Sequence, residues 1–191
     1  MRFGILFVGY IFLFVCKGVD IFPDFIAYLI MFAAMLNLYR FNKYFNIAKY
    51  LLIPTIIIAV INYILHIFKL DLGNVNTIVN FINNILFIVY HYYLYMGVKN
   101  LALEVNIPGI AKAALRNLYI GIVYTIFTLL VQFDIPVLKE YAFYIGPIFL
   151  LTGLIWIILT AVMIFRCYMW ICLEGDEDMP LNNIKNRIKK E

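Results

Sequence analysis

The chain has 191 residues, of which 65% are hydrophobic and 14% are charged, and its formal net charge is +4. A soluble domain is about half apolar and about a quarter charged, and a chain of this size would have to expose much of its apolar surplus to water. The composition therefore excludes an ordinary water-soluble domain and predicts an all-α polytopic membrane protein.

Stretches without charged residues mark the expected helices in chain order: residues 3–16, 25–39, 50–68, 72–98, 117–133 and 141–165. A spanning helix needs about 20 apolar residues, with a range of about 17–25, and the last four stretches meet it. The first two reach that length if Lys17 snorkels or if residues 39–41 extend the second helix. A re-entrant hairpin over residues 3–39 is the alternative. We expect six transmembrane helices in three hairpins, forming one domain over residues 1–173.

The basic residues predict the orientation of these helices. The N-terminus, the second and fourth connections and the C-terminal tail together carry twelve of the fifteen Lys and Arg residues. Cytoplasmic segments of membrane proteins are enriched in these residues. Both termini are therefore expected in the cytoplasm.

Polar residues inside the expected helices concentrate in the third and fourth. They are Thr55, Asn62, His66, Asn80, Asn83, Asn84 and His91. At about 100° per residue, Thr55, Asn62 and His66 share one face of the third helix, and Asn80, Asn84 and His91 share one face of the fourth. A hairpin that turns near Gly73 would place Asn62 beside Asn84.

The same hairpin would place His66 beside Asn80, and two interpretations of this polar set stay open. The side chains form either hydrogen bonds between the two helices or an outward-facing site for a small polar solute. No carboxylate or Arg lies at this depth, so the set is a poor ion-coupling site on its own.

Two cytoplasmic pieces carry further expectations. Residues 97–117 have apolar residues on both sides of Pro108-Gly109, which predicts either two short helices in the membrane interface or an ordered loop. The tail at 174–191 is charged, and its last part, 181–191, places Leu181, Ile184 and Ile188 on one face. We expect that part to lie as an amphipathic helix on the inner leaflet.

Two short segments resemble uncharacterised multi-pass integral membrane proteins of Firmicutes. They are DIFPDFIAY at residues 20–28 and RCYMWICLEGDEDMP at residues 166–180. The resemblance implies a bacterial plasma membrane protein. The size and topology are also similar to the substrate-binding subunits of energy-coupling-factor vitamin transporters, although the first helix has Gly4 and Gly9, five residues apart, in place of an AxxxA motif.

Motifs for soluble-style catalysis are absent from the sequence. There is no P-loop, HExxH or GxSxG motif, and Cys16, Cys167 and Cys172 lack zinc-type spacing. We expect no enzyme activity, cofactor, metal or nucleic-acid partner. The leading hypothesis is a transport-related solute-binding or permease subunit, with lipid, a small polar solute and other membrane subunits as partners. The alternative is an accessory or structural membrane protein that acts through protein partners without a ligand.

Overall fold

The computed structural model describes residues 2–19, 23–68, 74–132 and 142–171. These residues form six helices and no strand: α1 (Arg2–Val19), α2 (Asp24–Leu38), α3 (Lys43–Ile67), α4 (Asn74–Glu104), α5 (Pro108–Gln132) and α7 (Ala142–Ile171). The predicted all-α class is confirmed. The tail at 174–191 and the turn near Gly73 lie outside the described residues.

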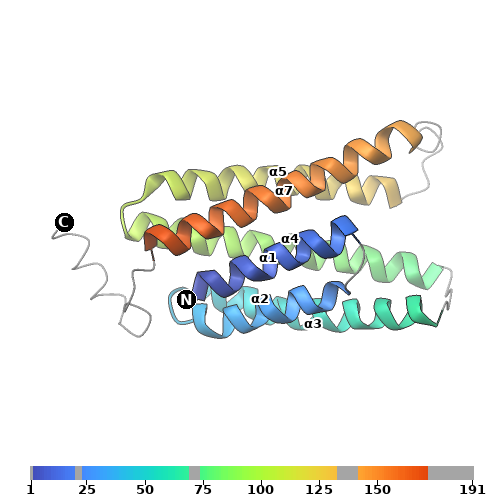
Figure 1. The fold of residues 1–191 in the computed structure, drawn as a ribbon, viewed down its shortest axis with the longest axis horizontal. Coiled ribbons are helices and arrows are strands. Elements are labelled where there is room, and N and C mark those ends of the chain that lie inside the picture. Colours follow the sequence, from blue (N-terminus) through green and yellow to red (C-terminus); the bar gives the residue numbers. More distant parts are fainter. Residues whose placement is uncertain (1, 20–22, 69–73, 133–141, 172–191) are drawn as a thin grey trace.

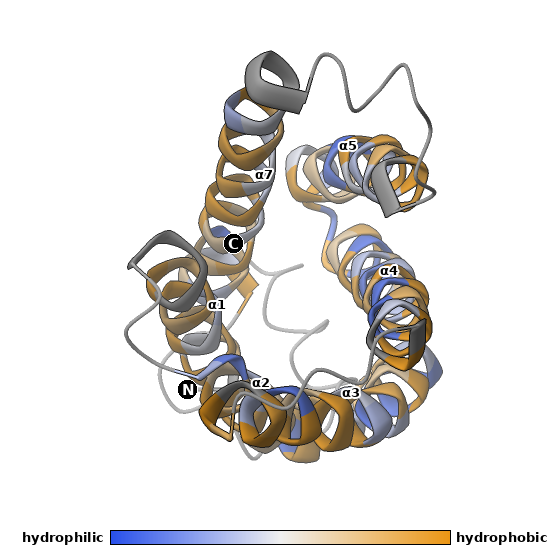
Figure 2. Cartoon of the chain, turned by 90° about the vertical axis from the view of Figure 1, so that its right-hand side faces the viewer, coloured by the Kyte–Doolittle hydropathy of each residue, from blue (hydrophilic) through white to orange (hydrophobic). Residues whose placement is uncertain are grey.

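The six helices form a closed ring. Each packs against the next one in the chain, and α7 returns to pack against α1 (Figures 1 and 2). The rings of Phe7 and Phe165, whose centroids lie 5.2 Å apart, are part of that closing contact. The short connections between successive helices make each neighbouring pair antiparallel.

The number of helices suited to span a membrane differs from the prediction. Within the described residues, three segments are long and apolar enough: Lys43–Leu65, Pro108–Leu130 and Gly146–Ile171. The apolar segments of α1 and α2, Phe3–Val15 and Asp24–Leu38, are shorter. Helix α4 is long enough but is the least apolar of the six, because it carries several asparagines and a histidine. Charge-free length alone therefore overcounted the helices that meet the combined test of length and hydropathy.

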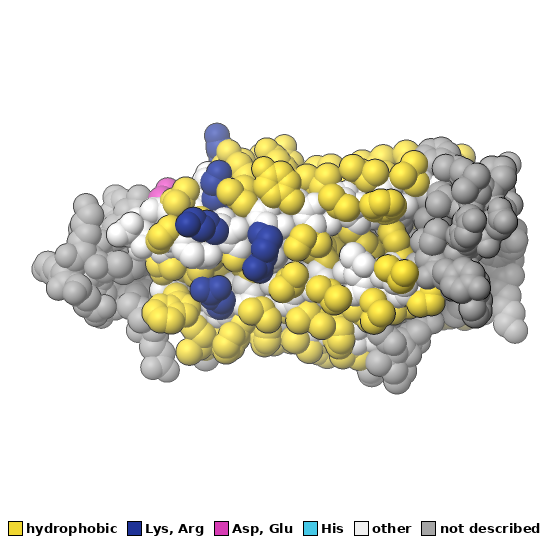
Figure 3. Space-filling model, turned by 90° about the horizontal axis from the view of Figure 1, so that it is seen from above, with side chains coloured by type: hydrophobic (Ala, Val, Ile, Leu, Met, Phe, Trp, Pro, Cys, Tyr) yellow, Lys and Arg dark blue, Asp and Glu magenta, His cyan; other side chains and the backbone are white. Residues whose placement is uncertain are grey.

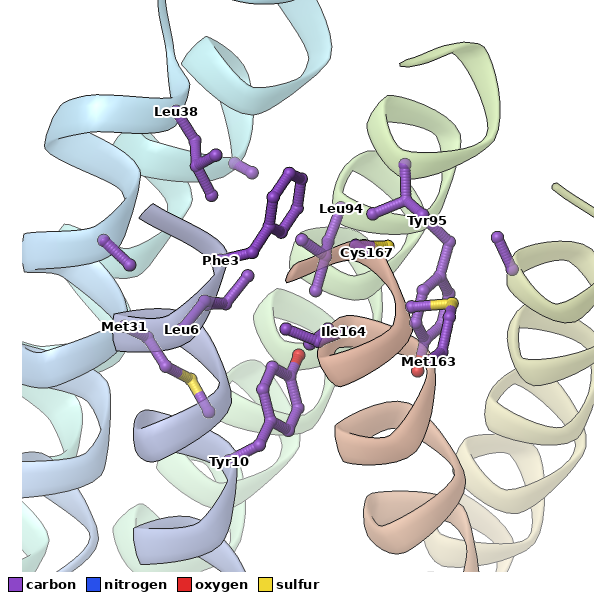
Figure 4. Close-up of a cluster of buried hydrophobic side chains, with 14 of the residues drawn as sticks. Phe3, Leu6, Tyr10, Met31, Leu38, Leu94, Tyr95, Met163, Ile164 and Cys167 are labelled. Atoms are coloured by element: carbon purple, nitrogen blue, oxygen red, sulfur yellow. The ribbon is translucent and has the colours of Figure 1, made fainter. Parts of the chain in front are cut away.

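Packing is concentrated in one half of the ring. This half contains the first turns of α1, α3 and α5 and the last turns of α2, α4 and α7, and we call it the basic half. Leu6 and Tyr10 of α1 enter a cluster with Leu94 of α4 and Ile164 of α7 (Figure 4). Burial of these large side chains is the main apolar contribution to stability inside the ring.

The basic half takes its name from its charged side chains. The described Lys and Arg side chains are Arg40, Lys43, Lys49, Lys99, Lys112, Arg116 and Arg166, all near the helix ends of this half. Figure 3 shows Lys and Arg gathered toward one end of the face in view. The ammonium group of Lys49 lies 4.5 Å from the ring centroid of Tyr39 and 4.4 Å from that of Tyr50. Such basic and aromatic pairs are typical of a membrane–water interface.

The connection between α4 and α5 contradicts both expectations for residues 97–117. Helix α4 continues to Glu104, and α5 begins only four residues later. Asn106 has a φ of 61°, and the amide of Ile107 donates to the carbonyl of Ala102 at 2.8 Å. This is a Schellman motif, which ends a helix tightly. Most apolar residues of the segment are buried in the core, among them Leu101, Ala102 and Ile110, so the predicted interfacial helices are wrong.

Glycines let α5 and α7 approach closely. A Cβ at Gly121 would lie 2.5 Å from the ring of Trp156, and a Cβ at Gly153 would lie 2.7 Å from the hydroxyl of Tyr124. Each helix therefore places a large aromatic side chain over a glycine of the other. This reciprocal contact fixes the distance between the two helices.

The contact makes the bundle sensitive to one methyl group. Gly121→Ala should lower the free energy of unfolding by about 1–3 kcal/mol, because the indole of Trp156 has to move. Gly146→Ala is the matched control, since a Cβ there meets nothing within 4 Å. Thermal unfolding of both variants in detergent measures the difference, and equal melting temperatures would contradict the close α5–α7 packing.

Candidate functional site

The core-facing side of α3 changes from apolar to polar along the helix. Its buried positions, Phe45, Ala48, Leu52, Thr55 and Ala59, follow the three-and-four spacing of one helical face. The next position in that spacing is Asn62. The opposite face carries isoleucines that are exposed on the outside of the ring, among them Ile57 and Ile64.

Helix α4 shows the same change in the opposite chain direction. Val98, Leu94 and His91 are buried in the basic half. Asn84 and Asn80 continue this face, within about 20° of His91 at 100° per residue. Exposed isoleucines, Ile78, Ile82 and Ile85, occupy the opposite face. On this face Asn62 and Asn84 are half-buried and Asn80 is exposed, so the tight packing of the basic half does not continue here, while isoleucines occupy the opposite faces.

The asparagines form a group in the half of the ring opposite the basic half. We call Asn62, Asn80, Asn83 and Asn84 the asparagine group. The amide nitrogen of Asn62 donates to the side-chain oxygen of Asn80 at 3.3 Å. Helices α3 and α4 are therefore neighbours, as expected, but Asn62 bonds to Asn80 instead of the predicted Asn84. Asn80 lies four residues, about one turn, before the predicted partner Asn84.

Three other predicted residues are placed as follows. The hydroxyl of Thr55 is buried and donates to the carbonyl of Leu51 in its own helix at 2.9 Å. His91 pairs with the hydroxyl of Tyr10 on α1. The side chain of His66 lies outside the described part of the structure, so its predicted pairing with Asn80 is untested.

His91 is the most enclosed polar residue of this region. Its Nδ1 lies 2.8 Å from the carbonyl oxygen of Phe87, and its Nε2 lies 2.9 Å from the hydroxyl oxygen of Tyr10. Because a carbonyl only accepts, Nδ1 carries the proton, and in the neutral ring Nε2 accepts the proton of the Tyr10 hydroxyl. This bond connects α1 to α4 across the interior of the ring.

Aromatic rings surround His91. Their centroids lie at 4.3 Å (Phe87), 4.7 Å (Trp156), 5.0 Å (Tyr90), 5.6 Å (Tyr95) and 5.8 Å (Tyr10) from that of the imidazole. We call His91 and these five residues the histidine cluster. It joins α1, α4 and α7 and lies between the packed core and the asparagine group.

A directed chain of hydrogen bonds continues from the cluster to α5. Thr160 donates to the carbonyl of Trp156 at 2.9 Å, so the hydroxyl of Tyr95, 2.6 Å away, donates to Thr160. The indole of Trp156 then donates to the carbonyl of Asn117 at 3.0 Å. The side chain of Asn117 donates to the carbonyl of Leu159, also at 3.0 Å. These bonds fix α7 between α4 and α5.

The sequence interpretation missed most of the histidine cluster. It included His91 but not Tyr10, Tyr95, Trp156 or Thr160. One local signal was available, the run Tyr-His-Tyr-Tyr-Leu-Tyr at residues 90–95, in which two of the four tyrosines are buried. The partners on α1 and α7 lie far away in sequence and give no comparable signal.

The buried polar side chains in the described part of the ring are uncharged hydrogen-bonding groups. Its buried polar residues are Thr55, His91, Asn117, Thr125 and Thr160, and no Asp, Glu, Lys or Arg is buried among the described residues. Nor does that part of the chain hold a group of three residues able to ligate a metal. The arrangement is suited to uncharged polar groups.

No family model, curated protein or solved structure significantly matches this chain. The function is therefore argued from the arrangement of these side chains alone.

The hydrogen bond between Tyr10 and His91 leads to a prediction for stability. Tyr10→Phe leaves a buried imidazole nitrogen without its donor, which should cost about 1–3 kcal/mol. Tyr92→Phe is the control, because Tyr92 lies on the same helix and is 42% exposed. Thermal unfolding in detergent should show a lower melting temperature for Tyr10→Phe only. Equal melting of the two variants would exclude a stabilising role for this bond.

Proposed function

We propose that this chain is a multi-pass bacterial plasma membrane protein that binds a small, uncharged polar solute within its ring of helices, as a solute-binding or permease subunit of a transport system. The observation that carries the proposal is the change along α3 and α4. The helical face that forms buried core in the basic half carries asparagine in the other half, where it is half-buried or exposed, while the opposite faces stay isoleucine.

The ring supports the view that all six helices cross the membrane. Helix α4 packs between α3 and α5, and α1 and α2 complete the ring between α7 and α3. A bilayer that surrounds the three long apolar segments also encloses the helices packed between them. The asparagines of α4 then face protein, where intramembrane polar residues are normally found. The short helices α1 and α2 match the bilayer by local thinning or by snorkelling of end residues.

The charge distribution supports cytoplasmic termini. The basic half, with its Lys and Arg side chains and tyrosine partners, belongs at the cytoplasmic interface by the positive-inside rule. The asparagine group then lies toward the outside, above a packed cytoplasmic half. A solute from outside would reach the amides before it reached the histidine cluster.

Asparagine amides supply both donors and acceptors but no charge. Since the described residues bury no charged side chain, an ion would lose its hydration without a counter-charge. Both nitrogens of His91 are used in hydrogen bonds within the chain, which argues against a role as a catalytic base. An uncharged amide or hydroxyl compound fits this chemistry best.

A second candidate is the accessory protein without a ligand. The hydrogen bond between Asn62 and Asn80 favours it, because that bond joins the two side chains across the hairpin without a ligand. Under this alternative the asparagine group only holds α3 to α4.

Cysteine labelling tests the proposed topology. Single cysteines at positions 46 and 108, in a background without Cys16, Cys167 and Cys172, should resist an impermeant thiol reagent in intact cells. Cysteines at positions 74 and 137 should react. Labelling at position 46 together with protection at position 74 would reverse the orientation.

Thermal stabilisation tests the proposed solute. We expect purified protein to gain stability from at least one of acetamide, uracil, ribose or glycerol in a saturable manner, and none from acetate or choline. At 100 times the dissociation constant the gain is about 2.7 kcal/mol. Asn84→Leu should abolish the gain while the protein stays folded.

Asn37→Leu, at an exposed asparagine of α2, should keep the gain. If no uncharged solute stabilises the wild type and Asn84→Leu changes only the melting temperature, the accessory role is supported instead.

A further inference from the structure

Basic side chains of two helices meet at the seam between α5 and α7. Both helices contain segments that are long and apolar enough to span a membrane. A Cβ placed on Gly109, in the first turn of α5, would lie 3.8 Å from a terminal guanidinium nitrogen of Arg166 on α7. The guanidinium of Arg166 therefore reaches across to the beginning of α5.

Arg116 is held at the same seam by a buried asparagine. Its Nη2 donates to Oδ1 of Asn117 at 3.3 Å, and the amide nitrogen of Asn117 donates to the carbonyl of Leu159 on α7 at 3.0 Å. Since Asn117 bonds to α7, its contact keeps the guanidinium of Arg116 on the α7 side of α5. An Arg guanidinium has five N–H donors, and this contact uses at most two of them.

The exposed side of α5 changes from basic to apolar along the helix. Lys112 and Arg116 are exposed in its first turns, and the exposed residues Tyr119 and Val123 follow. At 100° per residue, these four positions fall within about 60° of one another. One side of α5 therefore places two cations directly before an apolar surface.

Helix α7 carries a matching stripe in the opposite chain direction. Val162 and Arg166 are both exposed and lie about 40° apart on the helix. Arg166 lies beside Gly109. Earlier in α7, Trp156 lies beside Gly121, which is farther along α5, so the two helices are antiparallel. The basic ends of the two stripes therefore lie at the same level of the ring.

Positive charge predominates at this end of the ring among the described residues. Seven Lys and Arg side chains are described in the basic half, against one carboxylate, that of Glu104. Figure 3 looks onto the side of the ring with α5 and α7 and shows basic side chains gathered toward one end, with hydrophobic side chains beyond them. A negatively charged group bound at the seam would offset the repulsion among these cations.

We infer that the seam between α5 and α7 binds an anionic phospholipid, whose phosphate accepts hydrogen bonds from Arg116 and Arg166 while Lys112 adds positive charge. Guanidinium groups bind phosphate through two parallel hydrogen bonds, and basic pockets between membrane helices suit anionic headgroups. The apolar surface that begins directly beyond the cations accommodates acyl chains, whereas a free phosphate or an acidic peptide would make no use of it. The site lies on the outer surface of the ring, so the inference goes beyond the proposed function and does not depend on a solute.

Native mass spectrometry of the full chain in detergent tests the inference, with phosphatidylglycerol and phosphatidylcholine of identical acyl chains as probes. The wild type should bind its first phosphatidylglycerol about tenfold or more tightly than phosphatidylcholine. Arg116→Gln combined with Arg166→Gln should weaken phosphatidylglycerol binding by about 25-fold, because each cation near an anionic headgroup contributes a factor of about five. Binding of phosphatidylcholine should stay unchanged.

Lys43→Gln combined with Lys49→Gln is the matched control. It also removes two charges from the basic half, but from α3, where both ammonium groups lie over tyrosine rings. This control should keep the preference for phosphatidylglycerol. Arg166→Gln alone, at an exposed residue, should weaken phosphatidylglycerol binding by about fivefold and keeps the test decisive if the double variant does not fold.

Each contrary outcome overturns the inference in a different way. Equal binding of the two lipids by the wild type would exclude a headgroup site. Equal losses in the two double variants would show a diffuse attraction to the basic half instead of a site at the seam. Displacement of phosphatidylglycerol by an equal concentration of glycerol phosphate would identify a site for free phosphate. If phosphatidylglycerol binds only after the acidic residues of 174–178 are replaced by their amides, that run of the chain itself occupies the seam.

Discussion

Lipid offers no hydrogen bonds, so a polar side chain on a membrane helix has to find its partner inside the protein. In this ring that constraint decides which way α3 and α4 face. Isoleucines cover their outer sides, and Asn62, Asn80 and Asn84 take the positions that Leu, Ala and Thr occupy in the basic half. The histidine cluster obeys the same constraint, because Tyr10 and the Phe87 carbonyl together satisfy both nitrogens of His91.

Periodicity could predict the helical class and the common faces of α3 and α4, but not their register. Moving α4 by one turn against α3 rotates each residue position by only about 40°, so the same faces still meet. Asn62 can therefore bond to Asn80 or to Asn84 without changing the pattern of polar residues in either helix. The side-chain hydrogen bond between Asn62 and Asn80 decides between the two registers, and a single sequence does not contain that information.

The contacts between α1 and α4 and between α4 and α7 could not be predicted either, because they join residues far apart in the sequence. The bond between Tyr10 and His91 joins residues 81 positions apart, and the bond between Tyr95 and Thr160 joins residues 65 positions apart. Neither Tyr10 nor Thr160 differs locally from an ordinary residue of an apolar helix. For residues 97–117 a local signal was present, but it led to the wrong prediction. Pro108-Gly109 and the nearby charges resemble an interfacial segment, whereas the Schellman motif at Asn106 ends α4 within the packed core.

The asparagine group therefore combines two physical situations. The side-chain oxygen of Asn80 already accepts a hydrogen bond from Asn62, and this pair costs little when no solute is present. The side-chain oxygen of Asn83 is buried without a hydrogen-bond partner among the described residues, and leaving it so reduces the stability of the empty ring. A binding site gains affinity when a solute restores hydrogen bonds that the empty protein lacks, because the cost of desolvating those groups has been met during folding. Under the proposed function, the bond between Asn62 and Asn80 holds the hairpin together, while the unpaired oxygen of Asn83 favours the binding of a solute that can donate a hydrogen bond to it.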